Sequence, residues 1–290
     1  MLNGVLAVDK PVGPTSHDAV SAVRRALHTR EVGHTGTLDP FASGLLLICV
    51  GKATRLAEYL TATSKRYVAT MRLGATTDTD DLTGEVVASS DGWRDLTEDA
   101  IRAALAAQVG TIQQVPPAYS AKKVDGERMY AVARRGGEVE RKPVTVTIHS
   151  IDVVEIRLPE VEFAVSCGSG TYIRAIARDV GAALGVGGHL TTLRRTHVGE
   201  HDVARAVTFA ELGDADAVAR ATLTPAEAVA HLPSTVVPAD QRALLANGRA
   251  LPIDGDLPSG VPVALLAESG ELLAIGERTG DLLKPRKVFA

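Results

Sequence analysis

A glycine-rich segment with one aspartate before a proline is the first place in this sequence where chemistry could occur. Residues 31–44 read EVGHTGTLDPFASG and place Asp39 directly before Pro40. Proline disfavours the helical region for the residue before it, so Asp39 is held extended, while glycines let the backbone approach a ligand closely. Such a loop can present a single acid to a substrate. An Asx-type turn, in which Asp39 only accepts hydrogen bonds from backbone amides, is the alternative.

A second polar turn lies between a predicted strand and a predicted helix. Residues 168–174 read GSGTYIR, which places Arg174 in the first turn of that helix. Glycine turns at helix starts favour anions, but this one lacks the Gly-Lys-Ser/Thr of a Walker A loop. Arg174 is therefore a candidate partner for a carboxylate or a phosphate, with a plain surface arginine as the alternative.

Two patterns that resemble metal or cofactor sites lack the parts that such sites need. His197 and His201 are four residues apart, but Gly199 lies between them and no glutamate follows His197. The glycines of residues 185–188 lack the strand, spacing and acid of a dinucleotide fingerprint. The sequence therefore predicts no metal and no cofactor.

Composition narrows the class of protein. At 290 residues and 45% hydrophobic content, the chain has the length of about two domains. Its longest strongly apolar run, residues 45–50, is far below the ~20 residues of a membrane-spanning helix. The N-terminus lacks the basic region and cleavage site of a signal peptide, and two distant cysteines form no disulfide framework. We expect a cytoplasmic protein with no membrane segment.

Charge is unevenly distributed along the chain, although the net charge is −4. Residues 1–75 carry 9 basic and 5 acidic residues, and residues 114–199 carry 12 and 9. Residues 76–113 carry 2 and 8, residues 200–283 carry 5 and 13, and three basic residues follow at 284–287. A segregated field can bind phosphates on one face of an anionic protein. Solvated faces without function would give the same pattern.

Periodicity predicts the elements that position these residues. Strands are expected at 4–8, 45–50, 67–73, 144–148 and 161–165, with residues 31–44 as a loop. Helices are expected at 55–60, 97–109 and 173–180, of which the second has Thr97 as its N-cap. Two further helices are expected, one after an N-cap at Ser16 and one after a capping box at 224–227. From residue 234, short apolar segments alternate with turns such as Asn247-Gly248, which predicts a small β-rich unit with one helix at 239–246.

Tyrosines beside basic residues suit the binding of splayed nucleotides. Tyr67, Tyr119, Tyr130 and Tyr172 each lie close to lysine or arginine in the sequence. Stacking surfaces interleaved with cations are typical of RNA-binding sites. Amphipathic tyrosines at the edge of the core are the alternative, which we favour for Tyr130.

Taken together, these segments resemble the TruB family of tRNA pseudouridine synthases. The loop 33–46 (GHTGTLDPFASGLL) is similar to the family's catalytic loop. Further similar blocks lie at residues 8–16, 65–67, 74–80, 116–121, 167–174 and 193–195, in the family's order. Residues 234–290 are similar to the PUA RNA-binding module, a weaker match.

The resemblance implies a fold and a set of roles. The fold would be α+β, with a central, largely antiparallel mixed sheet, flanking helices and a catalytic cleft in residues 1–233, and a PUA-like domain in 234–290. Asp39 would be the essential acid, Tyr67 would stack on the target base, and Arg174 would pair with the aspartate. His34, Tyr172 and Leu193 would line the uridine pocket. Candidates for phosphate contacts are Arg55, Lys65, Arg134, Arg135, Arg141 and Lys142, the last four in or beside an RNA-gripping segment at about 120–142.

The implied reaction converts uridine 55 in the T loop of tRNA to pseudouridine. It breaks an N-glycosidic bond, rotates the base and rejoins it through carbon, which needs one acid, a closed pocket and no redox cofactor. The base must first be flipped out. Whether Asp39 attacks the sugar, attacks the base or removes a sugar proton stays open.

Three other functions compete with this interpretation. An RNA-binding protein with a vestigial site would have lost Asp39 or Tyr67. A guide-RNA-dependent enzyme would work in a particle, whereas this chain lacks long lysine-rich tails, so we expect a stand-alone monomer whose partner is tRNA. A phosphate-ester hydrolase would need a metal site, and its only candidate cluster, Asp78 to Asp81, is better explained as a loop that polarises neighbouring basic groups.

Overall fold

A computed structural model describes residues 2–119, 123–124, 127–128, 141–253 and 256–289. Its first strands are β1 (Gly4–Lys10), β2 (Val32–His34), β3 (Ser43–Val50), β4 (Lys65–Leu73), β5 (Ala75–Thr77), β6 (Val86–Ser89), β7 (Gly110–Gln114), β8 (Lys123–Val124), β9 (Glu127–Arg128), β10 (Val144–Arg157) and β11 (Glu160–Cys167). Those that follow are β12 (Gly188–Val198), β13 (His201–Asp202), β14 (Val207–Thr208), β15 (Thr222–Leu223), β16 (Ser234–Val236), β17 (Leu251–Pro252), β18 (Pro262–Leu266), β19 (Leu272–Thr279) and β20 (Leu282–Val288). The helices are α1 (Ser16–Ala26), α2 (Ala57–Thr61), α3 (Glu98–Ala106), α5 (Ile173–Ala183), α6 (Ala215–Ala221), α7 (Pro225–Ala228) and α8 (Arg242–Ala246).

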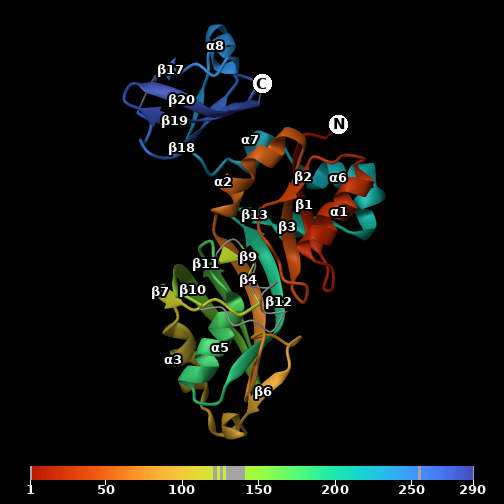
Figure 1. Ribbon diagram of the computed structural model, residues 1–290, viewed down its shortest axis with the longest axis vertical. Helices are drawn as coiled ribbons and strands as arrows, with labels where there is room; N and C mark the ends of the chain where they lie inside the picture. Colours follow the sequence, from red (N-terminus) through yellow and green to blue (C-terminus); the bar gives the residue numbers. More distant parts are fainter. Residues whose placement is uncertain (1, 120–122, 125–126, 129–140, 254–255, 290) are drawn as a thin grey trace.

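One long sheet forms the body of the molecule (Figure 1). Its strands follow the order β14-β1-β3-β12-β4-β11-β10-β7, with β2, β13 and β15 attached beside this path. Neighbours are antiparallel except β1 with β14 and β3 with β12. The predicted α+β class with a largely antiparallel mixed sheet is therefore confirmed.

The buried positions of the strands follow the sequence pattern. The apolar run at 45–50 is buried at every position, as a central strand covered on both faces should be. Strand β4 instead alternates, with Tyr67, Ala69, Met71 and Leu73 buried. Helix α5 packs against β12 and β4, and α3 packs against α5 and β10. The sheet centre and the start of α5 are thereby held rigidly.

Several predicted boundaries are wrong, each for a physical reason. Thr15, not Ser16, is the N-cap of α1 and forms a capping box with Asp18. The segment 31–44 is not wholly a loop, because Val32–His34 pairs with β3 as β2. Helix α3 ends at Ala106 because Gly110, at a φ of 111°, already begins β7. Strand β10 continues to Arg157 because β11 pairs with it beyond the predicted end at residue 148.

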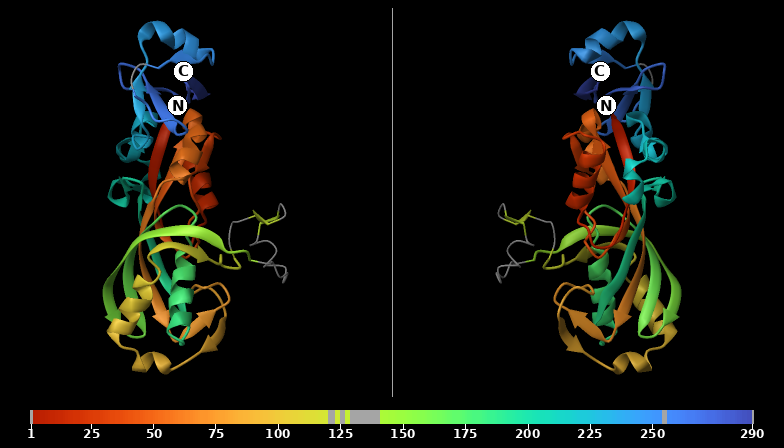
Figure 2. Two further views of the ribbon diagram at one scale, coloured as in Figure 1. Left: turned by 90° about the vertical axis from the view of Figure 1, so that its left-hand side faces the viewer. Right: turned by 90° about the vertical axis from the view of Figure 1, so that its right-hand side faces the viewer.

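The C-terminal residues form a second, five-stranded sheet in the order β16-β18-β19-β20-β17, together with α8. Figures 1 and 2 show this sheet at one end of the elongated molecule. It shares an apolar core with the main body. Ala264, Leu272, Ile275 and Phe289 pack in one cluster with buried residues that include Leu45, Leu47 and Leu60.

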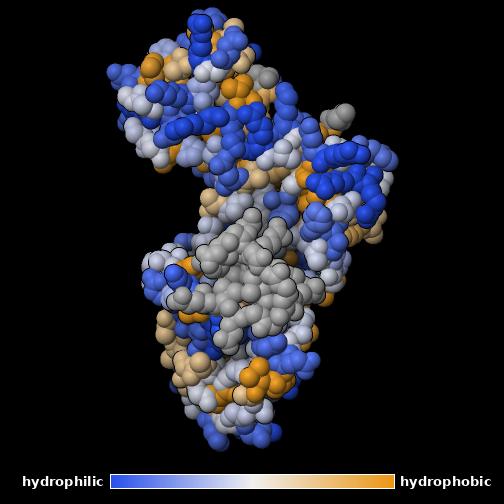
Figure 3. Space-filling view, in the orientation of Figure 1, coloured by the Kyte–Doolittle hydropathy of each residue, from blue (hydrophilic) through white to orange (hydrophobic). Residues whose placement is uncertain are grey.

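The outer surface is mostly hydrophilic on the face drawn in Figure 3. One apolar area lies over β6 at the end opposite the C-terminal sheet, where Val86 and Val87 are exposed. None of the helices in the described part of the chain is long and apolar enough to cross a membrane.

Candidate functional site

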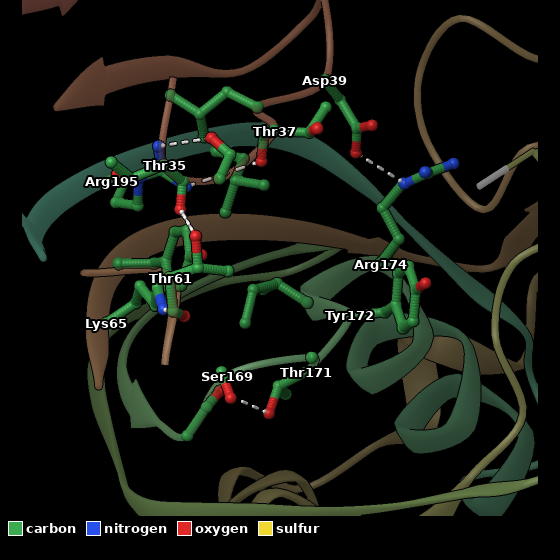
Figure 4. Close-up of a pocket in the computed structure, with 17 residues that line it drawn as sticks. Thr35, Thr37, Asp39, Thr61, Lys65, Ser169, Thr171, Tyr172, Arg174 and Arg195 are labelled. Carbon is green, nitrogen blue, oxygen red and sulfur yellow. Dashed lines mark hydrogen bonds and ion pairs between the residues drawn. The ribbon is translucent and has the colours of Figure 1, made fainter. Parts of the chain in front are cut away.

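A cavity of about 260 Å³ lies where the Asp39 loop faces the start of α5 (Figure 4). Strands β4 and β12 contribute Tyr67 and Leu193 to its wall, and the turn before α5 contributes Tyr172. The volume is just below the usual range for small-molecule sites. The lining residues are Thr35 to Asp39, Thr61, Lys65, Tyr67, Gly168 to Arg174, Leu193 and Arg195.

Asp39 and Arg174 form an ion pair at this cavity. The Arg174 Nε lies 3.0 Å from the Asp39 Oδ2, as Figure 4 shows. The arginine side chain is 4% exposed, whereas that of the aspartate is 34% exposed. The arginine is thus fixed in the protein, and the carboxylate is open to a substrate. The structure thus places Arg174 against the carboxylate of Asp39, and the role of this pair in the reaction stays a prediction.

Local structure explains why Arg174 points at Asp39. Tyr172 is the N-cap residue of α5, so Arg174 falls in the first turn as predicted. The buried side chain of Gln114 holds this turn, because it donates to the Tyr172 carbonyl at 3.1 Å and accepts from the Tyr172 N–H at 2.8 Å. Nothing in the sequence pattern singles out Gln114.

The remaining nitrogens of Arg174 are also bonded. Its Nη1 lies 3.2 Å from the Asp81 Oδ2 and donates to the Thr79 carbonyl at 2.7 Å. Its Nη2 donates to the Tyr119 carbonyl at 2.8 Å. A guanidinium that is held at every nitrogen has no freedom to turn away from Asp39.

Asp81 lies at the site, although the sequence analysis did not distinguish it from the other acids of its run. Its side chain is 5% exposed, and its Oδ1 accepts hydrogen bonds from the Thr79 hydroxyl and from both the N–H and the hydroxyl of Thr83. Its neighbour Asp80 pairs with Arg178 at 2.9 Å. Two acids of the run at 78–81 therefore pair with arginines, and Asp81 holds the arginine of the site.

Opposing effects set the ionisation of Asp39. Burial raises the pKa of the Asp39 carboxyl above its ordinary value, and the cation of Arg174 lowers it. Asp81 raises this pKa and Lys10 lowers it. The carboxylate is thus less well solvated than an exposed one and is stabilised chiefly by one arginine.

Backbone contacts fix the Asp39 loop to α1 and to the preceding turn. The Ser16 hydroxyl donates to the Leu38 carbonyl at 3.0 Å and accepts from the Leu38 N–H at 2.8 Å, which is why Ser16 does not cap the helix. The Gly13 N–H donates to the Pro40 carbonyl at 2.8 Å. Both residues that flank Asp39 are therefore held by long-range hydrogen bonds.

The predicted uridine-pocket residues differ in where they lie. Tyr67, Tyr172 and Leu193 line the cavity, and Tyr67 is only 9% exposed. His34 is not among the described lining residues; its Nδ1 accepts a hydrogen bond from the Gly36 N–H at 3.3 Å. A direct role of His34 toward the substrate stays a prediction.

The predicted phosphate-binding cations also separate into groups. Lys65 is buried at the cavity, where its Nζ donates to the carbonyls of Thr61 and Thr63, and burial lowers its pKa to about 8. Arg55 instead lies against the C-terminal sheet, donating to the Val288 carbonyl at 2.5 Å. Arg141 and Lys142 are exposed. Arg134 and Arg135, with most of the segment 120–142, lie outside the described residues.

Within the described ranges, no three histidine, cysteine, aspartate or glutamate side chains gather as metal ligands do. The predicted absence of a metal and of a cofactor stays a prediction.

Two family models together match residues 24–242 of the chain. The N-terminal domain of the TruB family pseudouridylate synthases matches residues 24–173, and the tRNA pseudouridylate synthase B C-terminal domain matches residues 174–242. The chain belongs to the TruB family. It is therefore an enzyme that isomerises uridine to pseudouridine in tRNA.

Relatives of known name agree with this membership in the TruB family. The tRNA pseudouridine synthase B of Paenarthrobacter aurescens is 46% identical over all of this chain and 96% of its own length. The protein of the same name from Cutibacterium acnes is 49% identical, over 94% of this chain and 92% of its own.

Solved structures support the fold. A chain from an H/ACA ribonucleoprotein bound to a substrate RNA containing 2′-deoxyuridine is 28% identical, with a TM-score of 0.78 over 99% of this chain and 85% of that one. A chain from a Cbf5-Nop10-Gar1 complex is 30% identical, with a TM-score of 0.76, over 99% of this chain and 85% of that one.

Proposed function

We propose that this TruB family enzyme acts on uridine 55 in the T loop of tRNA, with Asp39 as the essential acid on a flipped-out base. The observation that carries the proposal is the ion pair of Asp39 with the buried Arg174 at the cavity. Tyr67 and Tyr172 offer aromatic faces to a base in that cavity, and Leu193 offers an apolar one. A flipped base gains stacking and hydrogen bonds there, which offset the few kcal/mol that unstacking costs.

The reaction needs a carboxylate whichever bond it forms first. Attack on the sugar, attack on the base and removal of a sugar proton each use the anionic form of Asp39. The cavity must then retain the detached base while it rotates. Arg174 keeps the carboxylate anionic and aimed, because it is fixed by Asp81, Thr79 and Tyr119.

Arg174→Gln should move the acid limb of the pH–rate profile to higher pH. Arg174 lowers the pKa of Asp39, so its loss raises that pKa, and the active carboxylate is then protonated at a higher pH than in the unchanged protein. Single-turnover rates between pH 4.5 and 8 measure the shift. Arg178→Gln, whose arginine pairs with Asp80 and Asp179 instead, is the matched control. An acid limb that moves down, or moves equally in both variants, contradicts the assignment.

The basic segment at about 120–142 is proposed to grip the RNA through phosphates. Glutamine is to replace Arg134, Arg135, Arg141 and Lys142. The slope of log Kd against log salt concentration should then fall by about 2 to 4, because RNA binding releases about one counterion fewer for each phosphate contact that is lost. KM should rise more than kcat falls. The matched control replaces Arg205, Arg220, Arg242 and Arg249 by glutamine, which removes the same number of positive charges from an acidic part of the chain. An unchanged slope in the first variant removes the segment from the interface.

Residues 234–290 are proposed to be a PUA-like domain, separated from the catalytic domain near residue 233. Every residue given a role in chemistry lies before residue 200, which supports this division. The basic residues near the C-terminus are partly engaged within the protein, since Lys287 pairs with Glu58 and Arg286 pairs with Glu277. Lys284 is exposed, and neither of these two glutamates is its partner. We further propose a monomeric, cytoplasmic enzyme that needs no guide RNA and no protein partner.

Incubation of the purified chain with an unmodified T-arm stem-loop tests the function directly. Pseudouridine is mapped at single-nucleotide resolution, and a stem-loop with cytidine at position 55 is the control. We expect modification at that uridine alone, without any added RNA or protein. Modification at another uridine overturns the assignment to uridine 55, and activity only after addition of a guide RNA overturns the stand-alone enzyme.

A further inference from the structure

Arg195 is a buried cation in the cavity wall to which no role has yet been given. It lies on β12 and is 2% exposed. Its backbone pairs with Tyr67 on the neighbouring strand β4 and with Gly44 on the other neighbouring strand, β3. Its side chain lines the same cavity as Asp39. Figure 4 shows it on the other side of the loop from Arg174.

The Arg195 guanidinium holds both ends of the Asp39 loop. Its Nε donates to the Leu45 carbonyl at 2.7 Å, beyond Asp39, and its Nη2 donates to the Gly36 carbonyl at 3.2 Å, before Asp39. A longer contact of 3.5 Å reaches the Thr37 carbonyl. One planar donor group thus spans the loop and ties it to the sheet.

The backbone of Arg195 fits the same loop closely. Gly44 has a φ of 105°, and a Cβ atom there would lie 2.2 Å from the Arg195 carbonyl oxygen. Only glycine can occupy this position, both for its backbone conformation and for space. The loop is therefore seated against Arg195 through both backbone and side chain.

Arg195 also lies beside Tyr67. The two residues pair across β12 and β4, and both side chains line the cavity. Burial raises the pKa of the Tyr67 hydroxyl, and the nearby cation of Arg195 opposes that rise. Arg195 is therefore next to both the Asp39 loop and the aromatic wall of the cavity.

Among the described residues, no carboxylate forms an ion pair that would explain the burial of Arg195. Within the described residues, Arg174, Arg178 and Arg194 each have a carboxylate within ion-pair distance, and Arg195 has none. Two further buried cations, Lys10 and Lys65, lie close enough that Arg195 contributes to lowering their pKa values, to about 8 in each case. Burying a cation among cations is costly, which points to a function that only a guanidinium supplies.

We infer that Arg195 is a positioning residue of the reaction, which aims Asp39 by clamping both ends of its loop. This inference rests on the proposed use of Asp39. Misplacement of a reacting group by about 1 Å can cost about 10²-fold in rate.

The test compares Arg195→Lys, Arg195→Gln and a neighbouring control, Arg194→Gln. Arg194 pairs with Asp9 and Ser43, and the cavity-lining residues do not include it. Single-turnover rates on the T-arm stem-loop and the Kd for that RNA are measured below each variant's melting temperature, with the folded fraction above about 95%. If Arg195→Gln does not fold, Arg195→Lys, which keeps the charge without the fork, carries the comparison.

We expect both Arg195 variants to lose about 10²-fold in single-turnover rate, with Kd within about threefold of the unchanged protein. Arg194→Gln should lose less than about threefold.

Rates within threefold of the unchanged protein in both Arg195 variants, or an equal loss in Arg194→Gln, overturn the inference. Asp39→Asn in the same assay separates this result from a failure of the proposed function. If Asp39→Asn is inactive while Arg195 is dispensable, only the positioning role fails. If Asp39→Asn is active, the proposed use of Asp39 fails first.

Discussion

Asp39→Asn is expected to abolish pseudouridine formation while leaving the protein folded and able to bind RNA. The substitution is nearly isosteric but removes the anion on which all three routes to the product depend. The side chain is 34% exposed at the cavity and is not packed in the core, so the loss falls on chemistry. We expect a rate reduced by at least about 10⁴-fold, as for other essential nucleophiles and bases. Single-turnover conversion of the T-arm stem-loop measures it.

Melting temperature and RNA affinity are the controls for Asp39→Asn. Burial raises the pKa of the Asp39 carboxyl, so a neutral amide costs the folded state little in desolvation. Loss of the ion pair with Arg174 works in the opposite direction. Residual turnover above about a hundredth of the original rate, from a preparation free of other synthases, would show that Asp39 is not essential.

Asp81→Asn is expected to lower the rate by about 10²-fold, although Asp81 does not line the cavity. The amide retains an oxygen for Thr79 and Thr83 but removes the second negative charge from Arg174. The Arg174 Nη1 then loses the carboxylate that holds it at 3.2 Å, and its alignment with Asp39 loosens. Positional errors of this kind are worth about two orders of magnitude in rate.

The matched control for Asp81→Asn is Asp78→Asn in the same loop. Asp78 is exposed and accepts a hydrogen bond from the Glu85 N–H at 2.9 Å, so the same chemical change there leaves Arg174 untouched. Equal rates in the two variants would show that Asp81 only supports its loop.

The Asp39 loop is predictable from the sequence because its determinants are local. Glycine allows backbone conformations that other residues avoid, and proline fixes its own φ, so their spacing indicates a loop that presents Asp39. Tyr67 and Arg174 could be placed through the family resemblance, and the structure brings both to the cavity. Asp81 could be recognised only as one of several acids in a run, because the sequence does not show which of them meets an arginine.

Other features depend on contacts that lie far apart along the chain. Ser16 is a good N-cap by type, yet Leu38, 22 residues away, takes its hydroxyl. Arg194 and Arg195 are adjacent, and only the pairing of β12 with β3 and β4 shows which of them is buried. Arg55 meets Val288, 233 residues later. Local patterns carry no information about such partners.

The core that joins the two sheets affects how the chain can fold during synthesis. Strand β1 leaves the ribosome first, but it pairs with β14 and β15, and its Val5 packs in the cluster that Phe289 completes. At about 5 to 20 residues per second, roughly 15 to 60 s separate the first strand from the last residues. For that time the face of β1 that carries Val5 lacks Phe289 and the other C-terminal residues of its cluster. Nascent chains that stall before the last strand therefore expose an apolar surface, and we expect chaperones and proteases to recognise such chains.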